Sequence, residues 1–267
     1  MIDPVVDASW IADRQVVLAD VRWYLDGRSG REAYERGHLP GAVFIDLDTA
    51  LAGPASPAEG RHPLPDPEVF AAALASAGIQ DQDQIIAYDD AGGLVASRLV
   101  WLLRVTGHDA ALLDGGLTAW PGELTTEIPV RPASKFTARP WPADRLASLE
   151  ETVSWPGPVL DARDAPRFRG DTEPVDPRAG HIPGARNLPC RDNVGADGRF
   201  RPPAELRERF AAVGVEAAAD VISYCGSGVT ACHNLIALEH AGLGAGRLFP
   251  GSWSQYSHTG RPAATGD

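Results

Sequence analysis

The sequence repeats itself at long range. The segment "ERGHLPGAVFIDL" around His38 returns as "RAGHIPGARNLPC" around His181. Downstream, "QIIAYDDAGGLVASRLVWLLRVTG" resembles "DVISYCGSGVTACHNLIALEHAG", and "LLDGGLTAW" resembles "LFPGSWSQY". The offsets lie between 136 and 143 residues. A period of this length indicates the duplication of a whole domain rather than a short solenoid repeat.

Each half alternates between strand and helix patterns. The runs "QIIAYD" and "DVISYC" are short, apolar and β-branched, as strands buried on both faces are. The segments "DPEVFAAALASAG" and "PPAELRERFAAVG" begin at an acidic residue or proline and end at glycine, which predicts helices. The pattern predicts two α/β domains, each a mostly parallel central sheet flanked by helices. We expect domains over 1–125 and 146–267, joined by a Pro-rich linker over 126–145.

Composition excludes several classes of function. The formal net charge of −12 argues against nucleic acid or an anionic membrane as the main partner. The start lacks the basic and apolar regions of a secretory signal, and no apolar run is long enough to span a bilayer. Three cysteines are too few for a disulfide framework, so we expect a cytoplasmic protein. Their spacing does not suggest a metal site, and we expect Cys190 and Cys232 to be buried packing residues.

The turn after "VISYC" is the strongest functional signal. Ligands bind beyond the carboxyl ends of strands in open α/β sheets, and Cys225 stands at such an end. The small residues Gly226 and Gly228 let backbone N–H groups converge on one atom, and a helix starting near Val229 adds its positive end. The N–H groups from Gly226 through Gly228, Val229 and Thr230 are therefore candidates for binding the reacting group. This environment favours a thiolate, so Cys225 is the predicted nucleophile.

The two halves differ at this position. The first half reads "YDDAGG", with Asp89 where the second half has Cys225. One copy keeps a nucleophile and the other does not, as expected for a duplicated enzyme with one working site. A cysteine phosphatase or arsenate reductase is disfavoured, because phosphate chemistry in such a loop needs an arginine six residues after the cysteine. Here that residue is Ala231.

The duplicated "GH(L/I)PGA" frame, the loop "CGSGVT" and the segment "GSW" at Gly251 resemble the rhodanese family. They resemble in particular its tandem-domain 3-mercaptopyruvate sulfurtransferases, and the resemblance spans almost the whole chain. It implies two rhodanese-like α/β domains, an inactive first and a catalytic second. It also implies sulfur transfer through a persulfide on Cys225, without a metal or organic cofactor.

The loop composition bears on the sulfur donor. Thiosulfate enzymes of the family resemble "CRKGVT" here, whereas this chain has the uncharged Gly226 and Ser227. An uncharged loop fits a donor whose charge is bound elsewhere, such as 3-mercaptopyruvate. The resemblance points to Arg169 and Arg178 as the groups that hold its carboxylate and oxo oxygens, and guanidinium suits that task. Arg98, in the first-half counterpart of the active helix, is a further candidate for binding substrate.

Loss of sulfur from 3-mercaptopyruvate leaves an enolate that must be protonated. The resemblance implies a relay of Ser227 with His62 and Asp46, similar to a protease triad. His38 and His181 occupy the same position of the repeated "GHxPGA" turn, which favours a structural role for both. Asp20 and Asp161, at strand ends, are expected to anchor local turns.

Several alternatives stay open at this point. A thiosulfate sulfurtransferase is the nearest, and a non-catalytic tandem binding module is more distant. For the enzyme, the expected acceptor is a thiol such as thioredoxin or glutathione, or cyanide in an assay. The sequence does not distinguish among these acceptors.

Overall fold

The computed structural model describes residues 1–267 and divides into two compact units. The first comprises residues 1–53, 65–141 and 194–200, and the second comprises 54–64, 142–193 and 201–267. Each unit thus takes one short segment from the other half of the sequence. A division into the consecutive blocks 1–125 and 146–267 does not anticipate these two segments.

The first unit contains a parallel sheet of five strands in the order β1-β5-β4-β2-β3. The strands are β1 (Val5–Val6), β2 (Val17–Asp20), β3 (Val43–Phe44), β4 (Ile85–Tyr88) and β5 (Ala110–Leu113). The helices are α1 (Ala8–Ile11), α2 (Gly30–Arg36), α3 (Leu47–Ala50), α4 (Pro67–Ser76) and α5 (Ala96–Val105).

The second unit contains a parallel sheet of four strands in the order β7-β6-β8-β9. The strands are β6 (Val159–Asp161), β7 (Arg186–Asn187), β8 (Ile222–Tyr224) and β9 (Arg247–Leu248). The helices are α6 (Leu149–Ser154), α7 (Ala165–Arg169), α8 (Pro203–Ala212), α9 (Ala231–His240) and α10 (Ser252–Tyr256). Short 3₁₀ turns occur at η1 (Ala143–Arg145), η2 (Cys190–Asn193) and η3 (Ala218–Asp220).

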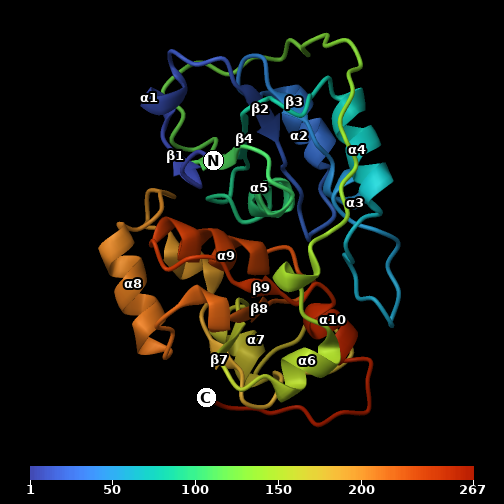
Figure 1. Ribbon diagram of the computed structural model, residues 1–267, viewed down its shortest axis with the longest axis vertical. Helices are drawn as coiled ribbons and strands as arrows, with labels where there is room; N and C mark the ends of the chain where they lie inside the picture. The colour runs from blue at the N-terminus through green and yellow to red at the C-terminus, as the bar shows by residue number, and fades with distance from the viewer. The chain divides into compact units, whose positions relative to one another are not determined.

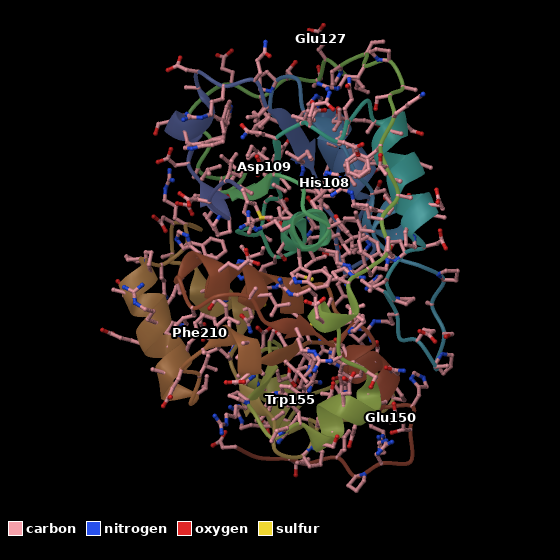
Figure 2. All side chains as sticks on the ribbon, in the orientation of Figure 1. His108, Asp109, Glu127, Glu150, Trp155 and Phe210 are labelled. Carbon is pink, nitrogen blue, oxygen red and sulfur yellow. The ribbon has the colours of Figure 1, made fainter.

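The predicted α/β fold is confirmed in both units, because every strand pair is parallel. The order β3-β2-β4-β5 in the first sheet also matches the order β7-β6-β8-β9 in the second. In the second unit α8 and α9 lie on one side of the sheet, and α6, α7 and α10 lie on the other (Figure 1). Phe210 of α8 (Figure 2) is fully buried. On the α6 and α10 side, Ile222, Tyr224 and Trp253 share one apolar cluster.

The local sequence explains where the helices begin. Asp66 caps α4 by accepting a hydrogen bond from the Glu68 N–H, and a proline occupies the first turn of both α4 and α8. Ser148 and Glu151 form a reciprocal capping box on α6. None of the helices has the length and apolar character needed to cross a bilayer.

The repeated histidines have a structural role, as predicted. The ring Nδ1 of His38 lies 2.8 Å from the Tyr34 carbonyl oxygen, and that of His181 lies 2.8 Å from the Phe168 carbonyl oxygen. Each ring also stacks on the aromatic residue whose carbonyl it contacts. Both histidines therefore tie the "GHxPGA" turn to the preceding helix.

Candidate active site

Cys225 lies directly after β8, where the carboxyl edge of the sheet meets the turn that leads into α9. The residue is 1% exposed, and the Gly228 N–H donates a hydrogen bond to its sulfur, with N and Sγ 3.1 Å apart. The Cys225 N–H donates to Ser252 Oγ (3.1 Å), and its carbonyl accepts from the Trp253 N–H (3.0 Å). The backbone of the cysteine is thus fixed on both sides of its Cα.

Two unusual backbone conformations support this loop. Gly228 has a φ of +77°, and a Cβ there would lie 2.5 Å from the Pro250 carbonyl oxygen. Ser252, with a φ of +52°, is the only non-glycine residue with a positive φ. Its hydroxyl accepts from the Cys225 N–H and donates to the Phe249 carbonyl. These bonds offset the backbone strain at Ser252.

The corresponding loop of the first unit holds a carboxylate. Both oxygens of Asp89 accept two backbone hydrogen bonds each, at 2.7–2.9 Å, from the N–H groups of Ala91, Gly93, Val95 and Ala96. Burial raises the pKa of Asp89, and these hydrogen bonds oppose the rise. A loop of this form therefore directs N–H groups at an atom two bonds beyond Cβ.

A serine and a histidine meet beside the cysteine. His62 Nδ1 and Ser227 Oγ are joined by a hydrogen bond of 2.8 Å, and each residue is 8% exposed. His62 comes from the segment 54–64, which belongs to the second unit. The structure thus brings together two residues of the predicted relay that lie 165 positions apart in the sequence.

Two guanidinium groups lie against Gly226. A Cβ built on this glycine would be 3.0 Å from Arg61 Nη2 and 3.5 Å from Arg167 Nη1. Neither nitrogen has a hydrogen-bond partner in the protein, and Arg61 Nε is buried without one. Both guanidiniums therefore retain N–H donors beside the loop, which suits the binding of an anion.

The other nitrogens of these guanidiniums are held by carboxylates. Asp176 contacts Arg61 Nη1 and also Arg167 Nη2, the latter at 3.2 Å. Glu173 accepts from Arg167 Nη2 at 2.7 Å and from Arg163 Nη1 at 3.2 Å. Arg163 in turn forms a buried pair with Asp161 at 2.6 Å, which anchors the turn after β6 as predicted.

The pKa values of Asp176 and Glu173 are shifted in opposite directions. Burial raises the pKa of Asp176, and the charge of Arg61 only partly opposes the rise. Burial acts in the same direction on Glu173. There, hydrogen bonds from Arg167 and from backbone N–H groups outweigh burial and lower the pKa.

The structure places the arginines predicted to bind substrate elsewhere. The Arg178 guanidinium donates to the carbonyl oxygens of Ser257, Arg261 and Tyr256, so all three of its nitrogens hold the C-terminal segment. Arg169 pairs with Asp171 in a partly exposed ion pair. The guanidiniums of Arg61 and Arg167, rather than those of Arg169 and Arg178, lie against Gly226, and the substrate-binding role of Arg169 and Arg178 stays a prediction. Arg167 stands two positions before Arg169 in "RFRG", and Arg61 directly precedes His62. Both arginines therefore lie in segments that the sequence analysis had already singled out.

The first unit contains the other two candidates. Asp46 caps α3 by accepting from the N–H and hydroxyl of Thr49 at 2.9 Å. Arg98 is fully buried on α5, and its Nε donates to the Leu51 carbonyl oxygen (3.2 Å). Their roles in the relay and in substrate binding stay predictions.

The remaining cysteines are buried, as expected. Burial raises the pKa of Cys190 to about 12, and Cys232 donates to the Gly228 carbonyl oxygen (3.4 Å). Trp253 is a core residue whose indole N–H donates to the Arg178 carbonyl oxygen. No cluster of three or more His, Cys, Asp or Glu side chains is placed to hold a metal ion.

Comparison with known proteins identifies relatives along the whole chain. A model of the rhodanese-like domain matches residues 8–123 and again 143–259. A Pseudomonas aeruginosa protein named "Probable 3-mercaptopyruvate sulfurtransferase" is 44% identical over 97% of this chain and 96% of its own length. A Mycobacterium tuberculosis protein, provisionally named a thiosulfate sulfurtransferase, is 38% identical over 91% of this chain and 88% of its own length.

Solved structures agree with these relatives. The 3-mercaptopyruvate sulfurtransferase from Leishmania major superposes with a TM-score of 0.84 at 32% identity, covering 97% of this chain and 75% of that one. A 3-mercaptopyruvate sulfotransferase structure from Escherichia coli gives 0.82 at 31% identity, covering 95% of this chain and all of that one. The chain therefore belongs to the rhodanese family, as a tandem of two rhodanese-like domains.

Proposed function

We propose that this protein is a sulfurtransferase that moves sulfur from 3-mercaptopyruvate to a thiol, or to cyanide in an assay, through a persulfide on Cys225. The observation that carries the proposal is the arrangement around the loop. A buried cysteine with a backbone N–H on its sulfur lies in an uncharged loop, and two guanidiniums with unused donors lie beside that loop.

The two guanidiniums supply the charge that the loop lacks. Arg61 and Arg167 are the proposed binding groups for the carboxylate and oxo oxygens of the donor, in place of Arg169 and Arg178. A planar guanidinium binds a carboxylate through paired N–H donors, and such charge-assisted bonds are strong. Bound there, 3-mercaptopyruvate has a carboxylate on the arginines and its sulfur free to reach Cys225.

The first half-reaction transfers the sulfur. The Cys225 thiolate attacks the sulfur of 3-mercaptopyruvate, an S–S bond forms, and the C–S bond breaks. The electron pair of that bond leaves with the carbon fragment as the enolate of pyruvate. Ser227 donates a proton to this enolate, and His62, 2.8 Å from the serine hydroxyl, returns a proton to Ser227.

The loop is suited to hold the transferred sulfur. The outer sulfur of a Cys225 persulfide lies two bonds beyond Cβ, as the carboxylate oxygens of Asp89 do in the first unit. Four backbone N–H groups converge on those oxygens. Asp89 and Cys225 are 136 residues apart. At the same offset, the N–H groups of Ser227 and Val229 correspond to those of Ala91 and Gly93. They would stabilise the persulfide anion until a thiol such as thioredoxin or glutathione removes the sulfur.

Thiosulfate is the second candidate donor. Two guanidiniums beside the loop can also hold a dianion, and one relative carries the thiosulfate name. Steady-state kinetics with each donor in turn, with Cys225→Ser as control, separate the two. A higher kcat/KM for 3-mercaptopyruvate that the mutation abolishes supports the proposal. A higher kcat/KM for thiosulfate keeps the persulfide and overturns the assignment of the donor.

A further inference from the structure

Asp176 is the one carboxylate that both loop-facing guanidiniums share. Its side chain is 2% exposed, and it contacts Arg61 Nη1 and Arg167 Nη2, which belong to the two guanidiniums that lie against Gly226. Its position in the loop between α7 and β7 is fixed further by its N–H, which donates to Glu173 Oε1 (3.0 Å). Asp176 thus contacts both of the groups proposed to receive the anionic donor.

The charges of the network cancel. Three guanidiniums, those of Arg61, Arg163 and Arg167, are linked by contacts to three carboxylates, those of Asp161, Glu173 and Asp176. Asp161 lies beyond Arg163, and Glu173 contacts only Arg167 of the loop-facing pair. Asp176 therefore has the largest influence on the charge that an anion meets at Gly226.

We propose that Asp176 determines which charge of donor the site accepts, by lowering the positive charge of Arg61 and Arg167 to suit a monoanion rather than a dianion. This inference rests on the proposed function, because it takes the loop at Cys225 as the donor site. The interaction of a fixed charge with a ligand scales with the charge of the ligand. Removing one negative charge therefore favours thiosulfate, a dianion, about twice as strongly as 3-mercaptopyruvate with its thiol protonated.

The test measures kcat/KM for both donors in the wild type and in Asp176→Asn, which keeps the shape of the side chain and removes its charge. We expect the ratio of kcat/KM for thiosulfate to kcat/KM for 3-mercaptopyruvate to rise about threefold at low ionic strength, and to rise less in high salt. Asp171→Asn is the matched control, because Asp171 is an aspartate of the same segment that pairs only with the surface group Arg169. Its ratio should equal that of the wild type.

A second measurement requires no turnover. Iodoacetamide is an uncharged alkylating agent that we expect to react with Cys225, and anions bound at the loop should protect the cysteine. The concentration of sulfate, a dianion, that gives half-protection should be about tenfold lower in Asp176→Asn than in the wild type. The half-protecting concentration of pyruvate, a monoanion, should fall by a smaller factor. In the wild type, pyruvate should protect Cys225 at a lower concentration than sulfate does. This comparison uses only the wild-type protein, so it tests the proposal even if Asp176→Asn does not fold.

The outcomes separate the two proposals. Asp176→Asn could lower kcat/KM by the same factor for both donors and leave the half-protecting concentrations of sulfate and pyruvate unchanged. In that case Asp176 only positions the arginines, and the selectivity proposal is overturned. Stronger protection of the wild type by sulfate than by pyruvate overturns it as well. If the wild type uses neither donor, the proposed function fails, and the protection assay still decides the role of Asp176.

Discussion

At the scale of single residues, the contact between Ser227 and His62 makes a prediction specific to the donor. Ser227→Ala should lower kcat with 3-mercaptopyruvate by about 10²-fold, because the enolate loses its proton donor. Thiosulfate should be much less affected, because its leaving group is sulfite, which departs without a proton. Turnover assays with both donors check this. An equal loss with the two donors would show that Ser227 acts on loop structure rather than on proton transfer.

The arginines give a second prediction at this scale. Arg167→Met should raise KM for 3-mercaptopyruvate and lower kcat/KM by about 10- to 100-fold, the cost of losing charge-assisted hydrogen bonds to the carboxylate. Arg169→Met is the matched control, two positions away, and should change kcat/KM little. The reverse order of effects in steady-state kinetics would restore Arg169 as the binding group and contradict the geometry at Gly226.

The positions of Cys225 and Ser227 in the turn after β8 could be predicted because they depend on local pattern. A strand, a cysteine and a glycine-rich turn specify where the Cys225 sulfur points. The choice between Arg167 and Arg169 could not be made this way. Both belong to one five-residue helix, and which of the two faces Gly226 depends on how α7 packs against the sheet.

At the scale of elements, the turn between β8 and α9 depends on Gly228. Gly228→Ala combines a φ of +77° with a Cβ 2.5 Å from the Pro250 carbonyl oxygen. We expect a loss of about 2–4 kcal/mol in the free energy of unfolding, measured by denaturant titration.

Gly184→Ala is the control for this change. Gly184 has a φ of +85°, but a Cβ there would have no atom within 4 Å. It should therefore cost only the conformational part, about 1 kcal/mol. Equal losses in the two variants would mean that contact with Pro250 does not constrain the loop.

Most elements could be predicted because their signals are local. The predicted strand in "DVISYC" is observed at Ile222–Tyr224, and the predicted helix in "PPAELRERFAAVG" is observed at Pro203–Ala212. The segment 54–64 carries no such signal, since it contains neither helix nor strand. It joins the second unit through contacts distant in sequence, such as the Arg61 N–H to Ser254 Oγ at 3.0 Å. That is why Arg61 was missed.

At the scale of the whole molecule, duplication explains both the repeated fold and the single candidate site. The two sheets share a strand order, and corresponding loops hold Asp89 in one unit and Cys225 in the other. The Asp89 carboxylate occupies its own loop, so that loop has neither a nucleophile nor room for a transferred sulfur. We therefore expect one active cysteine in each chain, although the fold is present twice.

The most direct test of this account is the mass of the protein after exposure to 3-mercaptopyruvate without an acceptor. Intact and peptide mass spectrometry should find one added sulfur per chain, on the peptide with Cys225, together with one released pyruvate. Cys190 and Cys232 should be unmodified, and Cys225→Ser should gain nothing. Absence of the added sulfur, or its persistence in Cys225→Ser, would contradict a persulfide on Cys225.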